Sequence, residues 1–352
     1  MFEARRDDPL HAVRVVDDVV EPPGPGEVLL AVERFGLSAN NLTYALLGDA
    51  LGHWAPFPAS SPDWGRVPAW GHAVVVDGDP GLAAPGSRWS GYLPMAGHFS
   101  VRAERHDHRL RAVAPERAGL LPLYRDLSPL PARGGESRED VAVAVLTTSA
   151  AALLDDAVAE LGPARVVLSS ATSRTALTVA LLLRRRGVAV AGITSPAHVG
   201  AAERAEVYDE VVDHDGVDAL GPVRGTVYLD VAGRAATTAA VHAHLGPALL
   251  RSIAVGGSHR AAQAGAPPPP APPGPPVERF TTAGRRVELV DRTGEDAVTA
   301  LEERARSAIE DWASTHVRVT TTTGVDGVPE VWERLVRGRV EPLTAEVVVP
   351  GT

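Results

Sequence analysis

The sequence contains no cysteine in its 352 residues. Disulfides, thiolate nucleophiles and cysteine-ligated zinc sites are therefore excluded together. Long apolar runs are also missing: no uninterrupted stretch is long enough to cross a bilayer, and the opening MFEARRDDPL has no apolar signal core. We therefore expect a soluble, cytoplasmic protein with no membrane partner.

Basic residues are fewer than acidic residues. The chain has 34 Lys and Arg against 44 Asp and Glu, a formal net charge of −10. This acidic excess argues against a nucleic-acid-binding surface. The length is sufficient for two domains, each with its own core.

Glycine is missing from one stretch where its absence matters, between Pro163 and Arg186. This stretch belongs to RVVLSSATSRTALTVALLLRRRGVAVAGIT (165–194), whose pattern of strand, tight loop, helix and strand is typical of the βαβ unit of a nucleotide-binding sheet. Thr172 or Ser173 is a suitable N-cap for the helix, and Gly187 offers a left-handed stop. A dinucleotide fold normally places glycines in the loop, so that backbone N–H groups can approach a pyrophosphate.

Small hydroxylated side chains take the place of glycine in this loop. They permit fairly close approach of a phosphate, their hydroxyls can bind its oxygens, and an arginine can supply charge. The loop therefore predicts a cofactor site made by Ser170, Thr172, Ser173, Arg174 and Thr175. The alternative is a Rossmann-type domain that has lost its ligand and packs serine and alanine in the gap.

The first third of the chain is β-rich in pattern. Residues 11–16 and 27–35 predict strands, separated by the rigid turn EPPGPG (21–26). GLSANNLTYALLGD (36–49) then predicts a loop followed by a short helix.

A family resemblance becomes specific at this point. EPPGPGEVLLAVERFGLSANNL resembles the opening of the medium-chain dehydrogenase/reductase superfamily, and GSRWSGY and AGHFSV are similar to two later strands of that family. VYLDVAG and SIAVGG fall where its cofactor domain has strands, and GVPEVWERLVRGRVEPLTAEVVVP resembles its C-terminal helix and returning strand. FGLSANNLTYALLGD and LSSATSRTA look closest to an uncharacterised bacterial branch, a domain of unknown function, on the zinc-independent, quinone-oxidoreductase-like side of the superfamily.

The resemblance implies an α/β protein of two domains. Residues 1–145 and 310–352 would form a GroES-like, β-rich catalytic domain, and 146–309 a Rossmann-type cofactor domain with a doubly wound parallel sheet. It also implies a homodimer joined through sheet edges. The segment APPPPAPPGPP (266–276) predicts extended polyproline, either a tolerated surface insertion or a docking segment.

A catalytic zinc ion is not expected. Zinc-dependent members of the superfamily use a Cys, a His in a Gly-His-Glu motif and a further Cys or Asp. Here His72 remains, but Ser38 resembles the first ligand position and Ala73 replaces the acid. One imidazole cannot supply three protein ligands, so His72 is expected to be a hydrogen-bonded cleft or core residue.

The resemblance implies that the loop with Asn40, Asn41 and Tyr44 borders the substrate cleft, with Tyr92 on a second cleft-facing segment. Asparagine amides can donate to a developing oxyanion and tyrosine can deliver a proton, so we predict these four as catalytic residues. The alternatives are turn chemistry for the asparagines and half-buried packing for the tyrosines. The run ALGHWAPFPASSPDWGRVPAW (50–70) predicts either a pocket wall or lid, or a minor core.

Cofactor choice depends on the end of the second strand of the βαβ unit. A carboxylate there would bind the ribose hydroxyls of NAD, but residues 193–196 contain no acid, which favours NADP(H). The remaining predicted cofactor contacts are Thr148, Thr194, Gly233 and Gly256.

We therefore expect a zinc-independent, NADPH-dependent reductase of a carbonyl or an activated double bond, acting on a small molecule. Two other functions remain open. One is a non-redox lyase or isomerase on a scaffold that has lost dinucleotide binding, and the other is a non-catalytic binding protein that uses the Pro-rich segment. A serine nucleophile is not supported, because no Gly-x-Ser-x-Gly elbow occurs.

Overall fold

The computed structural model describes the whole chain except residues 18–19, 131–134, 146–147, 256–270 and 352. The chain divides into unit 1, Met1–Leu146 with Arg318–Thr352, and unit 2, Thr147–Val317. The second division falls after Val317 and not after residue 309, because the helix α9 (Glu295–His316) continues without a break through that position.

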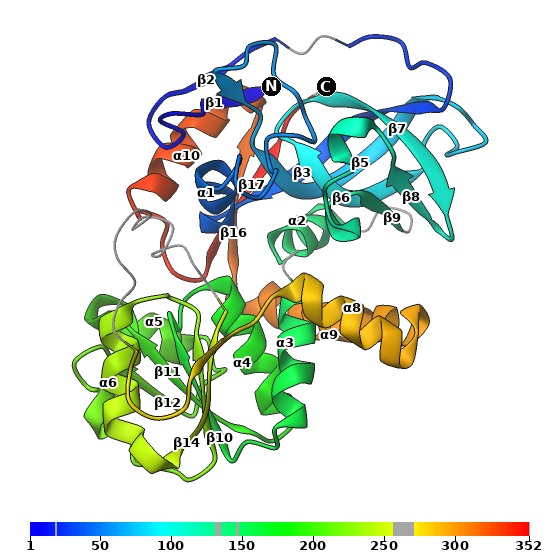
Figure 1. Cartoon of the computed structure of the whole chain (residues 1–352). Coiled ribbons are helices and arrows are strands. Elements are labelled where there is room, and N and C mark those ends of the chain that lie inside the picture. The colour runs from blue at the N-terminus through cyan, green and yellow to red at the C-terminus, as the bar shows by residue number, and fades with distance from the viewer. Residues whose placement is uncertain (18–19, 131–134, 146–147, 256–270, 352) are drawn as a thin grey trace. The chain divides into compact units, whose positions relative to one another are not determined.

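Unit 1 is built on a closed β-barrel (Figure 1). Its strands pair in the order β3 (Glu27–Leu37), β5 (Pro68–Gly78), β6 (Arg88–Pro94), β9 (Asp126–Leu130), β8 (Arg109–Ala112) and β7 (His98–His106). Because β7 also pairs with β3, the barrel has no free edge along that side. Two further strands extend the sheet beyond β3, namely β17 (Thr344–Val349) and then β16 (Arg318–Thr323).

β3 and β5 approach each other closely where a glycine replaces a larger residue. A Cβ at Gly71 of β5 would lie 2.4 Å from the carbonyl oxygen of Arg34. Along β3, Val28, Leu29, Leu30 and Val32 are all buried, so the burial of this strand alternates only in part.

A small sheet and two helices complete unit 1. The sheet contains β2 (Val13–Val15), β1 (Phe2–Arg5) and β4 (Trp64–Gly65). α10 (Val328–Val336) packs on it, with the rings of Phe2 and Trp332 at 5.2 Å. α1 (Ala39–Leu46) and α2 (Glu136–Ala144) lie beside the barrel strands.

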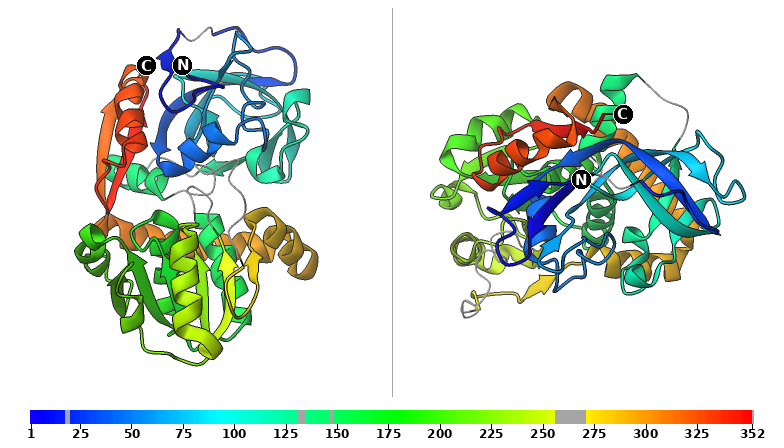
Figure 2. Two further views of the ribbon diagram at one scale, coloured as in Figure 1. Left: turned by 60° about the vertical axis from the view of Figure 1, so that its left-hand side comes forward. Right: turned by 90° about the horizontal axis from the view of Figure 1, so that it is seen from above.

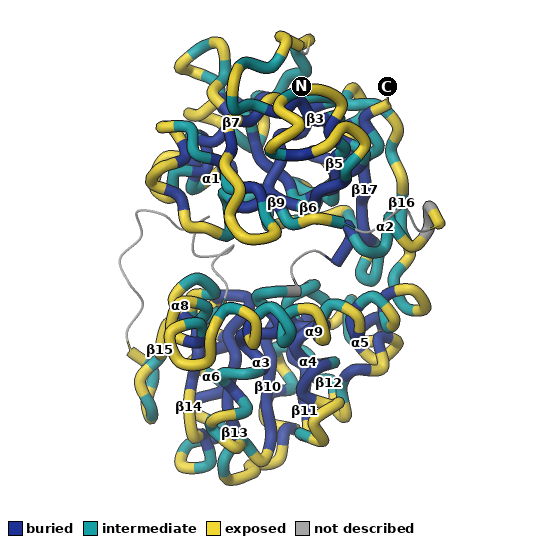
Figure 3. The backbone as a smooth tube through the Cα atoms, turned by 90° about the vertical axis from the view of Figure 1, so that its right-hand side faces the viewer, coloured by how far each residue is buried: buried dark blue, intermediate teal, exposed yellow. Residues whose placement is uncertain are grey.

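Unit 2 contains a six-stranded sheet in which every pair is parallel. Its order is β12 (Glu210–Asp213), β11 (Ala189–Thr194), β10 (Arg165–Ser169), β13 (Thr226–Asp230), β14 (Leu249–Ala254) and β15 (Val277–Arg279). Chain order reverses direction between β10 and β13, which is the topological switch point where such sheets bind ligands at their carboxyl edge. The central strands are buried along their length (Figure 3).

Helices cover both faces of this sheet, as the all-parallel pairing requires. α3 (Thr148–Glu160) and α4 (Arg174–Arg185) lie together on one face, while α6 (Ala235–Leu245) contributes Val241 and Leu245 to the core of the other. Figure 2 (left) shows α6, in yellow-green, lying in front of the sheet. The remaining helices are α5 (Val199–Arg204) and α8 (Thr282–Thr293), with α9 already given.

The predicted βαβ unit is confirmed. Ser173 caps α4, its Oγ accepting a hydrogen bond from the N–H of Ala176 at 3.3 Å, and Gly187 follows the helix at φ +80°.

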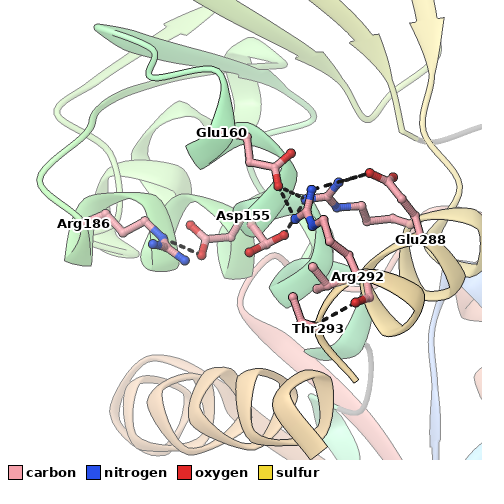
Figure 4. A network of polar contacts seen from close by, with 9 residues as sticks. Asp155, Glu160, Arg186, Glu288, Arg292 and Thr293 are labelled. Carbon is pink, nitrogen blue, oxygen red and sulfur yellow. Dashed lines mark hydrogen bonds and ion pairs between the residues drawn. The ribbon is translucent and has the colours of Figure 1, made fainter. Parts of the chain in front are cut away.

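Ion pairs join α3 to its neighbours (Figure 4). The carboxylate of Asp155 accepts a hydrogen bond from Nε of Arg186, just after α4, at 2.7 Å. Glu160, near the end of α3, pairs with Arg285 and Arg292 of α8. These contacts fix the helical layer that carries α4.

Among the described residues, no single helix is long and apolar enough to span a membrane. One bent pair, Arg138–Ala144 with Ser149–Glu160, passes that test only when both segments are counted together.

Candidate active site

The loop before α1 is shaped by a reciprocal cap. Ser38 Oγ accepts from the N–H of Asn40 at 3.3 Å, and Asn41 Oδ1 accepts from the N–H of Ser38 at 2.8 Å. Asn41 Nδ2 also donates to the carbonyl of Pro68 at 2.9 Å, and only 3% of Asn41 is exposed. We therefore place Asn41 in the fold and not among the groups that face a substrate.

Asn40 and Tyr44 lie one helical turn apart on α1, so their side chains meet. Asn40 Nδ2 donates to the Tyr44 hydroxyl at 2.7 Å, and Trp70 Nε1 donates to the same oxygen at 2.9 Å. A phenol has two acceptor positions and one proton. Because both acceptor positions are filled by N–H donors, the remaining function of this hydroxyl is to donate.

Burial keeps that hydroxyl protonated. Tyr44 is 5% exposed, and burial raises its pKa, although the hydrogen bonds from Trp70 and Asn40 act in the opposite direction. Tyr44 is thus an oriented neutral donor and not a phenolate base. The Asn40 and Trp70 side chains that hold it are only partly buried.

The ring of Tyr44 belongs to one aromatic cluster of five rings, formed by Tyr44, His53, Trp70, Tyr92 and Tyr124. The centroid of the Tyr44 ring lies 4.5 Å from that of His53 and 5.3 Å from that of Tyr92. Tyr124 meets Tyr92 at 4.9 Å and His53 at 5.3 Å. Each contact is tilted or edge-to-face, the arrangement that aromatic quadrupoles favour.

The run 50–70, predicted as a pocket wall or lid or as a minor core, contributes to two packed regions. His53 and Trp70 belong to the aromatic cluster. Trp54 is 3% exposed and fills core space that Gly48 and Gly65 leave open, since a Cβ at either glycine would lie within 2.2 Å of its ring.

Tyr92 is sealed inside the cluster. It is 1% exposed, its hydroxyl pairs with His53 Nδ1 at 2.9 Å, and burial raises its pKa well above the usual value. Burial lowers the pKa of His53 to about 4, so the imidazole is neutral at pH 7. Tyr92 therefore supports the ring of Tyr44, and this position does not suit the proton-delivering role predicted for it.

His72 belongs to a buried ionic network. Its Nδ1 lies 3.1 Å from Glu139 Oε2, and Arg88 bridges Glu139 at 2.7 Å and Glu33 at 2.8 Å. Burial lowers the pKa of His72 to about 4 against the opposing effect of Glu139. No group of three His, Asp or Glu side chains that could hold a metal ion occurs within the described residues.

The loop after β10 contains one residue in a conformation that glycine usually adopts. Ser170 adopts φ +56°, a left-handed conformation that a residue with a Cβ enters only with strain. Ser169 Oγ donates to Asp230 Oδ1 at 3.0 Å and accepts from the N–H groups of Val231 and Ala232 at 2.9 and 3.0 Å. Ser169 thus joins β10 to the end of β13 at the switch point.

The first turn of α4 is open. Thr172, Ser173, Arg174 and Thr175 are all partly exposed. The N–H of Thr175 has no acceptor within the described part of the chain. An N–H at a helix N-terminus is the type of donor that binds a phosphate oxygen, so these residues fit a pyrophosphate.

The other predicted cofactor residues differ in accessibility. The N–H of Gly233 is used by Asp230 Oδ1 at 2.8 Å, and Gly233 is buried at φ +74°, so it shapes a turn. Thr194 is 3% exposed. The side chain of Thr148 and all of Gly256 lie outside the described residues, as do positions 266–270 of the Pro-rich segment. From its described end, the carbonyl of Pro273 accepts from His242 Nδ1 at 2.7 Å.

Three groups at this edge were not among the predicted site residues. Ser169 and Asp230 form the hydrogen bond between β10 and β13 described above. Asp213 is the third: it pairs with Thr194 across β11 and β12, so an acid does stand beside the strand end. Its Oδ1 already accepts from the N–H groups of Asp215 and Gly216, at 3.0 and 2.8 Å. No pattern of spacing marked Asp213, because it comes from the neighbouring strand.

Structural comparison shows which known fold the chain shares. CurA from Vibrio vulnificus in complex with NADPH matches with a TM-score of 0.63 at 16% identity, covering 97% of this chain and 95% of that one. Mycobacterial Rv1454c complexed with NADPH matches at 0.63 and 18% identity, and Escherichia coli quinone oxidoreductase complexed with NADPH at 0.61 and 14%, each covering 99% of both chains. The chain has the fold of the medium-chain dehydrogenase/reductases, as its sequence predicted.

The family follows from the sequence. Residues 35–341 match the model described as "Protein of unknown function (DUF2855)", and the chain belongs to that family. No curated protein matches the chain.

Proposed function

We propose that this protein is a zinc-independent, NADPH-dependent reductase of a carbonyl or an activated carbon–carbon double bond in a small molecule. The fold supports this assignment, because several solved proteins with the same fold are described as complexes with NADPH. Fold alone does not determine chemistry, so the proposal depends on the site.

The observation that carries the proposal is the Tyr44 hydroxyl with both acceptor positions filled. Such a group can only donate, and it donates to an oxygen that gains negative charge. When hydride reaches a carbonyl carbon or a conjugated double bond, charge develops on the substrate oxygen, and a preoriented donor stabilises it. NADPH, when bound, would supply that hydride. Asn40 and Trp70 position the donor, while the surrounding rings exclude water.

The open first turn of α4 is the proposed pyrophosphate seat. Thr172, Ser173 and Thr175 would contribute hydroxyls and N–H groups, and Arg174 a positive charge. Thr148 and Thr194 remain proposed contacts of the nicotinamide and ribose ends. NADPH is favoured over NADH because β11 ends without an acid and the carboxylate of neighbouring Asp213 is partly engaged in its own turn. A homodimer through the edges of this sheet also remains a proposal.

The test is nucleotide binding. NADPH and NADH are titrated separately against the full chain, following nucleotide fluorescence and melting temperature. NADPH at 100 times its Kd is expected to stabilise the protein by about 2.7 kcal/mol. Arg174→Gln should weaken NADPH binding, while Arg185→Gln, an exposed arginine at the other end of the same helix, should not. Absence of any shift at millimolar nucleotide would remove the redox proposal and leave the lyase or isomerase alternative.

A further inference from the structure

Unit 1 contains a cavity of about 320 Å³ that the proposed reduction does not use. Its apolar walls come from Pro56, Phe57, Phe99 and Val101, and none of these residues belongs to the aromatic cluster around Tyr44. The volume lies at the lower end of the range for sites that hold small organic molecules.

An arginine that makes no ion pair or hydrogen bond through its guanidinium within the described residues lines this cavity. Arg117 ends the 3₁₀ turn Pro115–Arg117 and is 4% exposed. Its guanidinium carbon lies 4.5 Å from the centroid of the Phe57 ring, a cation–π contact. Within the described chain, the guanidinium makes no hydrogen bond or ion pair, yet none of its nitrogens is sealed from solvent. Each nitrogen thus keeps some accessible surface, and Arg117 is one of the residues that line the cavity.

The other charged side chains that line the cavity either have a counter-ion or are exposed. Arg66 donates to the buried Glu3 at 3.3 Å, and Arg102 pairs with Glu27 at 3.3 Å. Glu21 and Glu116 also line the cavity but are exposed, so solvent and salt screen them. The Met1 ammonium donates to the carbonyl oxygen of Val16 at 2.6 Å. Arg117 is therefore the buried cation of this wall whose donors have no acceptor within the described residues, although the exposed carboxylate of Glu116 attracts its charge.

We propose that this cavity binds a small monocarboxylate with an apolar body, and that Arg117 holds its carboxylate. A guanidinium presents a planar fork that matches a carboxylate with two parallel hydrogen bonds. Pro56, Phe57, Phe99 and Val101 would cover the apolar part of the ligand. A single negative charge fits best, because one buried cation lacks a partner and the two exposed glutamates disfavour a polyanion.

The energetics agree with a binding role. A buried charge without a counter-ion destabilises the fold unless a ligand compensates it. Burial lowers the pKa of Arg117 to about 10, so the group stays charged at neutral pH and the desolvation penalty persists. In the free protein, replacement of Arg117 by an apolar residue of similar length should therefore preserve or raise stability.

The experiment measures the melting temperature and binding heat of the full chain with butyrate, with the neutral isostere butyramide, and with inorganic phosphate, at constant ionic strength. Butyrate is expected to bind and butyramide and phosphate are not. Arg117→Met should fold with unchanged or higher stability and bind butyrate at least ten-fold more weakly. Arg102→Gln, at an exposed and already paired arginine of the same wall, should change butyrate affinity less than three-fold.

Several results would overturn the proposal. One is equal binding of butyramide and butyrate, which would mean that the charge is irrelevant. Others are stronger binding of phosphate than of butyrate, no binding of butyrate at all, or full butyrate affinity in Arg117→Met. If Arg117→Met does not fold, Arg117→Lys replaces it. Lysine keeps the charge but loses the fork, and the same ten-fold loss is expected. None of these results depends on NADPH, so the test is independent of the proposed reductase activity.

Discussion

The hydroxyl of Tyr208 donates to the carbonyl oxygen of Ala171 at 2.8 Å. Ala171 lies in the loop between β10 and α4, whereas Tyr208 precedes β12. The same ring lies against Gly192 of β11, where a Cβ would come within 3.1 Å of it. The segment before β12 therefore packs against the loop that we propose as the pyrophosphate-binding site and helps to hold it in place.

Tyr208→Phe should destabilise unit 2 and weaken NADPH binding together. The substitution leaves the Ala171 carbonyl without its donor, which costs about 1–3 kcal/mol where the group is buried. Urea unfolding measures the stability and fluorescence titration measures the affinity. Tyr124→Phe is the control, because the Tyr124 hydroxyl has no hydrogen bond within the described residues. A Tyr208→Phe protein with unchanged stability would show that the loop does not need this support.

Ser170→Gly should stabilise the protein. Serine at φ +56° carries strain of roughly 1–2 kcal/mol, while glycine costs roughly 0.5–1 kcal/mol of extra chain entropy. The net gain is expected to be about 0.5–1 kcal/mol in urea unfolding. Ser170→Ala keeps the Cβ and should bring no such gain, so equal stabilisation by both variants would show that strain is not the cause.

The sequence predicts most of the architecture because local patterns determine it. The pattern of residues 27–35 predicts the strand observed at Glu27–Leu37, and the stretch 165–194 changes from strand to helix period. Ser173, one of the two predicted N-caps, caps the helix. The site is less predictable because it depends on contacts distant in sequence. Nothing local distinguishes Asn40, which orients Tyr44, from Asn41, which completes a cap and binds Pro68. The left-handed conformation of Ser170 is equally hard to predict, because sequence rules expect glycine at such a position and this loop contains none.

Tyr44→Phe should abolish most of the turnover. If the phenol donates to the substrate oxygen, its loss should lower kcat about 10²–10³-fold with a smaller effect on KM. Asn40→Ala should cause a smaller loss, because Trp70 still donates to the Tyr44 hydroxyl. Initial rates of NADPH oxidation, with a carbonyl or enone substrate found by screening, provide the measurement. Thr43→Ala on the same helix is the matched control, and a Tyr44→Phe enzyme with wild-type kcat would remove Tyr44 from the mechanism.

Acid should destabilise unit 1 over a defined pH window, because His53 and His72 are held neutral. Burial lowers the pKa of each from 6.5 to about 4. Between these values the unfolded chain binds more protons than the folded one, so stability falls as pH decreases from about 6.5 towards 4. The loss is on the order of 3 kcal/mol per histidine at the acidic end. Urea unfolding at intervals from pH 7 to pH 4 measures this loss of stability.

Two variants test its origin. His53→Gln, whose amide can still pair with the Tyr92 hydroxyl, should reduce the slope of stability against pH. His11→Gln, at an exposed histidine, should leave that slope unchanged. An unchanged slope in His53→Gln would mean that the imidazole is protonated in the folded protein, and that the aromatic cluster around Tyr44 is wetter than its packing implies.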